Sequence, residues 1–462
     1  MAGTFTKGIS KILSGVYSRI VATVRRIVMG TRGIVAYPFT SDWGPVNELV
    51  LQSLGEFEET YNADKTTLTA SKIFVHANKG APSKILAYRM ATDTAKVGTC
   101  TLGTDSLQLE TLYPSARQFV AVVKDGVLDG TKVVEIVENG VKLVSAVGST
   151  NEELATELNK SDYVRVKTVG TVLPENAANI AFTGGDNGSV VTVTNYSDFL
   201  DEIEADGTAN SFSLDGVSDE AIITTVTTWL RRVRNEGFYV TFASGGPATW
   251  DDDISLANAA SVAHNYRGIV NVGNGCDGYT PAEMAIFIAA RVASVALNRT
   301  VTDETVPYTK VNKKIKITPR ETAKQKGTLI FVMNGDFVEI DEGVNTLTNP
   351  SNDESKEFGK IRVSNTLDYV TKDLEAFGNE YKKTKSNTDE ARQCYAAMVE
   401  ESYLRPLVND EIIKAGYFYR PDPEYHGDDA VYIPAIDEAF FDSDITPVDS
   451  MERIYQKIGV NF

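Results

Sequence analysis

Ser244 and Cys276 are the residues whose surroundings best fit a nucleophile. Ser244 follows a predicted strand over residues 238–243, and His264 lies further along the chain. A serine at the turn after a strand, with a histidine downstream, is typical of α/β hydrolases. The elbow motif GxSxG is not matched, however, because Phe242 stands where the first glycine would be. Cys276 has no base or cation beside it that would lower the pKa of its thiol. A serine or cysteine α/β hydrolase is therefore the alternative interpretation and not the leading one.

Phosphate and metal sites are equally poorly supported. Residues 273–278 are glycine-rich and lie between a predicted strand and a predicted helix, but they lack the GxGxxG spacing, and no GxxxxGK[ST] occurs in the chain. Asp251-Asp252-Asp253 resembles a cation site, yet a helix over residues 252–265 needs an N-cap and acidic residues in its first turn. The three cysteines and three histidines contain no CxxC pair or close histidine pair. We therefore predict no catalytic residues, no cofactor and no metal.

Composition limits the class of partner. The chain of 462 residues holds 63 acidic residues against 45 Lys and Arg, a net charge of −18. This balance argues against a protein that coats nucleic acid, whose affinity depends on cations that neutralise phosphates. The most apolar helix candidate, residues 281–298, carries Glu283 and Arg291, so no membrane-spanning segment is predicted. The start of the chain does not fit a signal peptide, because arginines interrupt any apolar stretch. We expect a bacterial-type cytosolic product, which disfavours a surface or adhesion module.

The hydrophobic pattern predicts an α/β core with an insertion. A strand over residues 34–37, a helix over 67–78 and a strand over 84–89 form a β–α–β unit. From about residue 95 to 189 the strands are short and separated by turns, of which Asn139-Gly140 is a good hairpin signal. This stretch is β-sandwich-like.

The α/β pattern then resumes, which implies a mostly parallel sheet with helices on its faces. The predicted strands cover residues 211–214, 238–243 and 268–272, the predicted helices cover residues 218–236, 252–265 and 281–298, and a hairpin over residues 327–340 turns at Asn334-Gly335. The β-rich stretch is therefore an insertion between two parts of one core. The last third is helical, with helices over residues 364–383 and 389–415, and a break is expected near Arg405 because Pro406 follows it.

The two ends of the chain differ in charge. The first 41 residues contain six cations and no acid, whereas residues 420–462 have a net charge of −7. Apolar side chains alternate at the C-terminus, which predicts a half-buried strand there, and residues 15–21 predict another. Terminal strands must pair with a sheet edge, in their own chain or in a neighbour's.

Nine short segments, in order along nearly the whole chain, resemble the tail sheath proteins of contractile phages and phage tail-like particles. They are Gly15-Val16-Tyr17 (with Ser14 where the family usually has proline), residues 32–36 (RGIVA), 43–45 (WGP), 87–90 (AYRM), 183–188 (TGGDNG), 196–200 (YSDFL), 345–347 (NTL), 362–368 and 447–455 (PVDSMERIY). Each segment alone is a weak signal, but their order is fairly specific.

The resemblance implies a plan of domains. It comprises an N-terminal arm (1–33), the first part of the α/β core (34–94), an inserted β-sandwich-like domain (95–195), a subtilisin-like α/β core without a catalytic triad (196–345), a helical or α+β C-terminal domain (346–445) and a C-terminal arm (446–462). Members of this family are structural and not enzymes, and fold alone does not fix function.

The resemblance also implies a mechanical function. Subunits would form hexameric rings around a tail tube, linked by exchanged terminal strands, and would contract from a metastable extended state to drive the tube through the target cell envelope. The partners would be the chain itself, the tube protein, and the baseplate and tail terminator or neck proteins, in a virion tail assembled in the bacterial cytoplasm. The residues expected to contact other subunits through the arms are Val16, Tyr17, Ile20, Ile454, Ile458, Val460 and Phe462.

A helix over residues 389–404 is a candidate for the inner wall that holds the tube. Arg392, Glu400 and Glu401 would supply its charged contacts. An ordinary solvent-exposed face is an equally good explanation of these charges.

Overall fold

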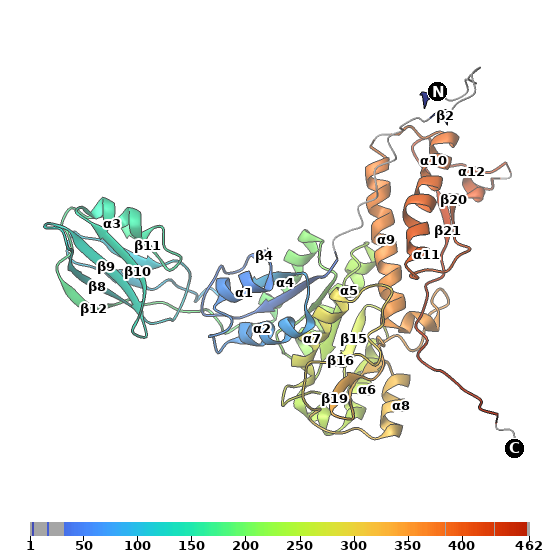
Figure 1. Cartoon of the computed structure of the whole chain (residues 1–462), viewed down its shortest axis with the longest axis horizontal. Helices are drawn as coiled ribbons and strands as arrows, with labels where there is room; N and C mark the ends of the chain where they lie inside the picture. The colour runs from blue at the N-terminus through green and yellow to red at the C-terminus, as the bar shows by residue number, and fades with distance from the viewer. Residues whose placement is uncertain (1, 4–15, 18–31, 384, 429, 460–462) are drawn as a thin grey trace. The chain divides into compact units, whose positions relative to one another are not determined.

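The computed structural model describes residues 2–3, 16–17, 32–383, 385–428 and 430–459 (Figure 1). Contacts divide the chain into two compact units. The α/β unit comprises the described residues of Thr31–Asp368 and Asp449–Phe462, and the helical unit comprises those of Met1–Gly30 and Tyr369–Val448.

A seven-stranded sheet forms the centre of the α/β unit. Its strand order is β17-β15-β14-β13-β3-β5-β4, and all neighbours are parallel except β4 and β5. The strands are β3 (Ile34–Phe39), β4 (Leu49–Gln52), β5 (Lys84–Arg89), β13 (Ser211–Ser213), β14 (Thr241–Gly245), β15 (Ile269–Val272) and β17 (Thr328–Leu329). Because β3 pairs with both β5 and β13, the segments before and after the insertion share one sheet, as predicted.

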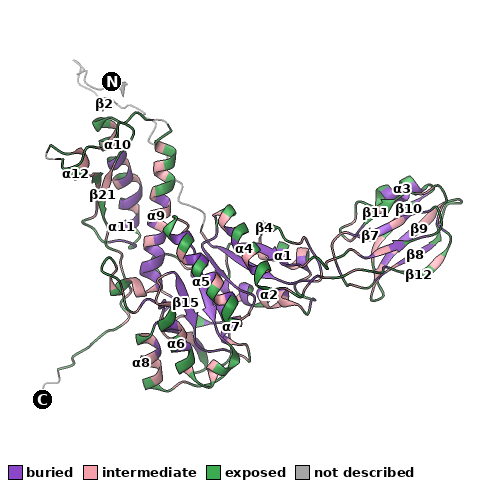
Figure 2. Cartoon of the chain, turned by 180° about the vertical axis from the view of Figure 1, so that it is seen from behind, coloured by how far each residue is buried: buried purple, intermediate pink, exposed green. Residues whose placement is uncertain are grey.

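Helices cover both faces of this sheet and enclose two apolar cores (Figure 2). They are α1 (Leu54–Tyr61), α2 (Thr69–Gly80), α4 (Val193–Asp206), α5 (Glu220–Asn235), α6 (Ile254–His264), α7 (Pro281–Ser294) and α8 (Ile317–Gln325). Helix α7 is apolar on nearly all sides because it lies buried against the sheet and α2. Its N-terminus is fixed by a capping box between Thr280 and Glu283.

The insertion consists of two sheets around a third core. One sheet has the order β10-β9-β8-β12 and the other β11-β7-β6. The elements are β6 (Thr99–Thr101), β7 (Gln108–Thr111), β8 (Phe119–Asp125), β9 (Lys132–Glu138), β10 (Val141–Gly148), α3 (Asn151–Leu158), β11 (Val164–Thr168) and β12 (Ala177–Ala181). Asn139 and Gly140 both have positive φ between β9 and β10, which confirms the predicted hairpin.

A small sheet completes the α/β unit. Strands β18 (Phe331–Asn334) and β19 (Phe337–Ile340) form the hairpin predicted at Asn334-Gly335, and β16 (Thr305–Val306) pairs with β19. Short 3₁₀ turns cover Ala248–Asp251 and Lys356–Gly359. Asp253 caps α6 by accepting a hydrogen bond from the amide of Ser255, so the aspartate run includes a helix cap.

The helical unit contains the other elements. They are β1 (Ala2–Gly3), β2 (Val16–Tyr17), α9 (Ile361–Tyr381), which starts in the α/β unit, α10 (Asp389–Val399), a π-helical turn (Glu400–Leu404), α11 (Arg405–Asn409), β20 (Phe418–Pro421), α12 (Pro423–His426) and β21 (Phe441–Asp444). A break in the helix was predicted near Arg405, but the chain stays helical there. The π turn carries the helix past Pro406, which lies in the first turn of α11, where a missing N–H is tolerated. In the described ranges, no helix has the length and hydropathy needed to cross a membrane.

Candidate assembly interface

Strands β20 and β21 form a two-stranded antiparallel sheet whose β21 edge is open, whereas Glu400 occupies the Tyr419 N–H on the β20 edge. Phe418 lies opposite Asp444 and Pro421 opposite Phe441. Among the described residues no third strand joins this pair. An open edge presents unpaired backbone donors and acceptors, which is a template for a strand from another chain. We call this pair the open hairpin.

One face of the open hairpin packs on α10 through aromatic rings. The ring of Tyr395 on α10 lies 5.8 Å from that of Tyr419 and 5.0 Å from that of Phe441. Tyr419 and Phe441 stack on each other across the two strands at 5.4 Å. These contacts fix the hairpin to a rigid support, so its edges are presented in a defined orientation. A groove of about 650 Å³ runs beside it, and its walls include Leu374, Tyr381, Tyr395, Tyr419 and Phe441.

Two of the three residues predicted to face the tube make contacts within this region. Arg392 is only 13% exposed, donates to Asn387 Oδ1 and forms an ion pair with Asp389. Glu400 accepts a hydrogen bond of 2.9 Å from the backbone N–H of Tyr419 on β20. Glu401 remains exposed and pairs with Arg405 one turn later. Arg392 and Glu400 are thus half-buried and Glu401 is exposed, and their contact with a tube stays a prediction.

Charge is unevenly distributed along residues 420–462, whose net charge is −7. All ten acidic residues of the last 43 lie between residues 422 and 452, whereas residues 453–462 contain Arg453 and Lys457 and no acid. Residues 421–444, which include β21, hold eight of these acids and no Lys or Arg. The expectation of an acidic C-terminal arm is thus wrong for the terminal segment itself. The last ten residues are thus cationic, as the N-terminal arm is, whereas β21 and the segment before it are acidic.

Residues 449–453 attach the C-terminal arm to the α/β unit, and we call them the arm root. The ammonium of Lys360 lies 2.5 Å from Asp449 Oδ2 and 2.6 Å from Glu452 Oε2. Thr302 donates to the other oxygen of Glu452 at 2.9 Å. Burial lowers the pKa of Lys360, but its hydrogen bonds to Asp449 and Glu452 outweigh this effect and raise that pKa above its usual value. Glu452 is only 8% exposed, so this is a partly buried ion pair.

Two further contacts complete the arm root. Arg362 donates to Ser450 Oγ at 2.6 Å. Arg453 lies 3.3 Å from Glu342, which also pairs with Lys324. Burial, together with the neighbouring carboxylates of Glu452 and Asp341, raises the pKa of Glu342 to about 7.

From Ile454 to Gly459 the chain is extended and exposed. Ile454, Tyr455 and Ile458 are 67%, 90% and 82% exposed, and residues 454–459 form no strand within the chain. The predicted half-buried strand is therefore not half-buried within the single subunit. Val460 and Phe462 lie outside the described residues.

The N-terminal arm is described in part. Val16 and Tyr17 pair in parallel with Ala2 and Gly3. Ile20 lies outside the described residues.

Glu452→Gln is expected to loosen the arm root without unfolding the subunit. The substitution removes a partly buried charge pair and leaves Lys360 with Asp449 alone, a local loss of about 1–3 kcal/mol. Hydrogen exchange of residues 449–453 in the full chain should therefore accelerate by about tenfold or more. Glu401→Gln is the matched control, because its exposed pair with Arg405 contributes little. Equal exchange at residues 449–453 in the wild type and in Glu452→Gln would show that this pair does not hold the root.

The residues of the hydrolase alternative do not form a catalytic arrangement. Ser244 and His264 both line a pocket of about 430 Å³. No hydrogen bond joins them within the described parts of the chain, and Ser244 is 4% exposed. Burial and the nearby Arg231 lower the pKa of His264. Burial, with Asp277 and Asp251, raises the pKa of Cys276 far above its usual value, so its thiol stays protonated.

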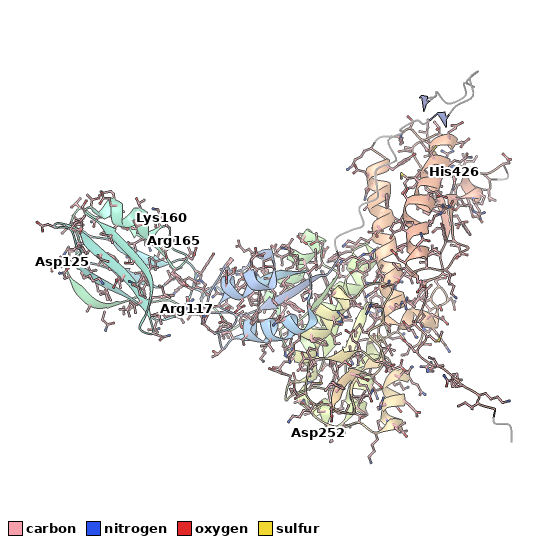
Figure 3. The ribbon with its side chains drawn as sticks, viewed as in Figure 1. Arg117, Asp125, Lys160, Arg165, Asp252 and His426 are labelled. Atoms are coloured by element: carbon pink, nitrogen blue, oxygen red, sulfur yellow. The ribbon has the colours of Figure 1, made fainter. Side chains whose placement is uncertain are left out.

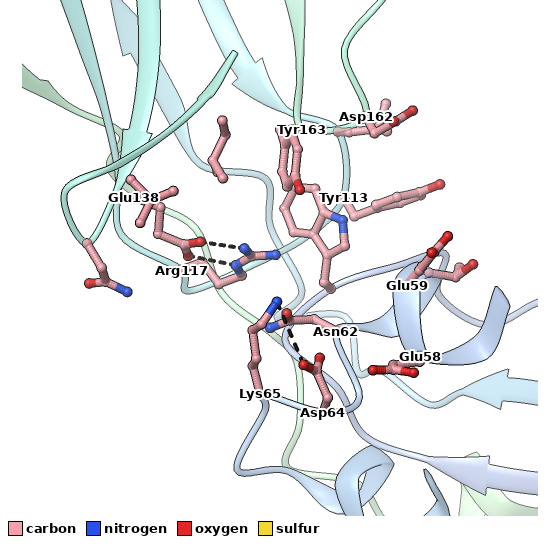
Figure 4. Close-up of a pocket in the computed structure, with 16 residues that line it drawn as sticks. Glu58, Glu59, Asn62, Asp64, Lys65, Tyr113, Arg117, Glu138, Asp162 and Tyr163 are labelled. Atoms are coloured by element: carbon pink, nitrogen blue, oxygen red, sulfur yellow. Dashed lines mark hydrogen bonds and ion pairs between the residues drawn. The ribbon is translucent and has the colours of Figure 1, made fainter. Parts of the chain in front are cut away.

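A second groove, of about 670 Å³, lies where the insertion joins the core (Figure 4). Arg117 forms two hydrogen bonds with Glu138, at 2.7 and 2.5 Å, and its guanidinium lies 4.8 Å from the ring of Trp43. Trp43 comes from the core segment and packs into the core of the insertion. Figure 3 places Arg117 at the near end of the insertion and Asp125 at its far end. These contacts hold the insertion in place. No cluster of metal-binding side chains occurs in the described ranges.

Comparison with known proteins identifies the family. The model of the phage tail sheath protein central domain matches residues 189–346, and that of the phage tail sheath C-terminal domain matches residues 353–461. Together these ranges cover more than half of the chain, which belongs to the phage tail sheath protein family.

Individual relatives and solved structures match this chain along nearly its whole length. The phage-like element PBSX protein XkdK of Bacillus subtilis is 21% identical over 99% of both chains. The crystal structure of the sheath tail protein from Desulfitobacterium hafniense has a TM-score of 0.73 at 20% identity, covering 97% of this chain and all of that one. The helical sheath of the anti-feeding prophage in its contracted state has a TM-score of 0.57 at 8% identity, covering 98% of this chain and all of that one. The mixed α/β fold is thus that of sheath proteins.

Proposed function

We propose that this chain is the structural subunit of a contractile tail sheath that polymerises by exchanging terminal strands. The proposal rests on one observation: the same subunit has an open hairpin and a C-terminal arm that is fixed at its root but exposed from Ile454 to Gly459. A subunit with an unfilled sheet edge and an unpaired strand is complete only in an assembly.

The attachment of the arms is β-augmentation. Backbone hydrogen bonds supply affinity, and alternating side chains fix the register of the added strand. Tyr17 on the N-terminal side and Ile454 and Ile458 on the C-terminal side are the residues that we assign to contacts between subunits, with Val16, Ile20, Val460 and Phe462. The N-terminal arm and residues 453–462 are cationic and β21 carries Asp442 and Asp444, so the charges favour donation of either arm to the β21 edge of a neighbour.

Rings of six subunits would stack around a tail tube, in a tail assembled in the bacterial cytoplasm. Contraction would convert a metastable extended lattice into a shorter and wider one, and would drive the tube through the target envelope. The arms would stay engaged and act as hinges, since packed interfaces switch between discrete arrangements. The tube, the baseplate and a terminator or neck protein would be the other partners. No nucleic acid, cofactor or catalysis takes part, and the subtilisin-like core and domain plan supply shape alone.

Electron microscopy of the purified full chain tests this function. We expect striated sleeves, in the absence of nucleotide, that a mild denaturing step converts to a shorter and wider form. A homogeneous small particle at high protein concentration would contradict the proposal. Labelling of Ser244 or Cys276 by a hydrolase probe would favour the alternative.

Reversing charge on the open hairpin should weaken assembly. Asp442 and Asp444 lie on β21, and Asp442 pairs with Arg420 at 3.0 Å. In Asp442→Lys/Asp444→Lys the acidic strand repels cationic arms, so assembly should need about tenfold more protein at low salt and less extra protein at high salt. Glu152→Lys/Glu157→Lys on α3 of the insertion is a matched control. Unchanged sleeve formation by the hairpin variant would contradict this assignment of the acceptor.

A further inference from the structure

An apolar surface in the helical unit has no covering element in the described structure. The segment between α12 and β21 carries four large apolar side chains in six residues. Their exposed fractions are 73% for Val431, 52% for Tyr432, 98% for Ile433 and 94% for Ile436. We call residues 430–438 the apolar loop. Contiguous apolar exposure of this kind is typical of an interaction site.

The apolar loop is held in a defined conformation. Asn387 Nδ2 donates to the carbonyl oxygens of Ile436 at 3.0 Å and Glu438 at 2.7 Å. The backbone N–H of Val431 donates to Glu424 O at 2.8 Å. These bonds leave Ile433 and Ile436 pointing away from the polar framework that supports them.

The base of the loop is closed by His426 and Tyr425. His426 Nε2 accepts a hydrogen bond of 2.8 Å from the N–H of Phe440, and Figure 3 labels this histidine. Burial and the nearby Arg392 lower the pKa of His426. Tyr425 stacks on Phe440 at 3.8 Å and on Tyr432 at 5.0 Å. The exposure of the isoleucines is thus a feature of the folded loop.

We propose that the apolar loop is a docking surface for the C-terminal arm of a second copy of this chain. The proposal rests on the function proposed above and adds a contact beyond the sheet edge. It explains two sets of exposed apolar side chains with one interaction, because Ile454, Tyr455 and Ile458 of the arm are also uncovered.

Charge favours the arm as the occupant. Arg453 is held in the arm root by Glu342, and Lys457 is the only charged side chain in the sequence from 454 to 462. The apolar loop ends in Asp437-Glu438 and is preceded by Asp428 and Asp429. An apolar segment with one cation therefore meets an apolar loop with acidic ends, so the charges favour the contact.

The length of the C-terminal arm also favours it as the occupant of the apolar loop. The nine residues from Ile454 to Phe462 reach roughly 30 Å when extended. Strand β21 has four residues, Phe441–Asp444, and the apolar loop leads directly into it. An arm paired along β21 therefore has about five residues left, enough to continue past Phe441 onto the loop.

Cross-linking between two tagged copies of the full chain tests the contact. Cys394 is exposed and is first replaced, Cys394→Ser, whereas Cys100 and Cys276 are buried. One copy then carries Ile433→Cys and the other Ile458→Cys, and the assembled sleeve is treated with a short bismaleimide. We expect a product that contains both tags. The control pairs Ile458→Cys with Val127→Cys, a fully exposed site in the insertion, and should give none.

Three results of this experiment would overturn the proposal. They are sleeves without the 433–458 product, a product within one copy only, and cross-linking of Ile433→Cys to tube protein instead. A wild-type chain that forms no sleeves would instead contradict the function proposed above, and the docking contact with it.

Replacing the isoleucines provides a second, independent measurement. Ile433→Ser/Ile436→Ser should raise the protein concentration needed for assembly by about tenfold or more, since two large apolar side chains lose their burial. Val127→Ser/Leu128→Ser removes side chains that are 104% and 73% exposed and should leave that concentration unchanged. Equal concentrations for the loop variant and the wild type would overturn the proposal.

Discussion

Deletion of residues 454–462 should leave a folded subunit that forms no sleeves. In the single chain Ile454, Tyr455 and Ile458 are exposed and residues 454–459 belong to no strand, so removal of this described part of the arm costs the subunit no buried contact. In the assembly the same residues would supply a strand of the shared sheet, and without them the hairpin edge stays open. Sedimentation and electron microscopy should therefore show a monomer at concentrations where the wild type polymerises.

A slightly longer deletion separates the arm from its root. Removing residues 451–462 also removes Glu452, which pairs with Lys360 and accepts from Thr302. This variant should lose assembly and also some stability of the α/β unit, whereas the shorter deletion should keep the wild-type unfolding curve. Sleeves of normal length from the shorter variant would show that the terminal segment is not the linking strand.

Arg234→Met should destabilise the α/β unit by about 3 kcal/mol or more, the largest single effect on stability that we expect. The guanidinium lies 2.8 Å from both oxygens of Asp368 and donates to Val240 O at 2.9 Å. The side chains of Arg234 and Asp368 are 2% and 10% exposed. Loss of the arginine leaves a buried carboxylate with only Arg267, at 3.6 Å, as a cation.

Urea unfolding followed by tryptophan fluorescence measures this effect. Trp43, Trp229 and Trp250 are the only tryptophans, and all three lie in the α/β unit. The double variant Arg234→Met/Asp368→Leu should recover most of the lost stability, because no charge is then left buried. A single variant within 1 kcal/mol of the wild type would show that this pair is not what fixes the start of α9.

The sequence predicts the α/β unit well because its signals are local. Helix α5 has an aspartate cap at Asp219 and a strong apolar stripe, and residues 139–140 have the turn chemistry of a hairpin. The open hairpin could not be found in this way. Its strands have four residues each and are separated by residues 422–440, so neither periodicity nor turn type marks them as partners.

The candidate interface shows where local reasoning fails. Arg392 and Glu400 suggested a charged helix face, but periodicity does not say what a side chain contacts. Here Arg392 donates to Asn387, and Glu400 accepts from Tyr419 of the hairpin. The net charge of residues 420–462 predicted an acidic C-terminal arm, but that sum combines the acidic residues 421–444 with the cationic residues 453–462. The alternation of Ile454 and Ile458 predicted a strand that the single chain cannot form, since its partner edge is expected in another copy.

A cryo-EM map of the assembled sleeve is the decisive measurement for strand exchange. We expect density for residues 454–462 to leave the arm root of one subunit and to lie as a strand against β21 of another. Density that instead returns to the open hairpin of the same subunit would contradict it.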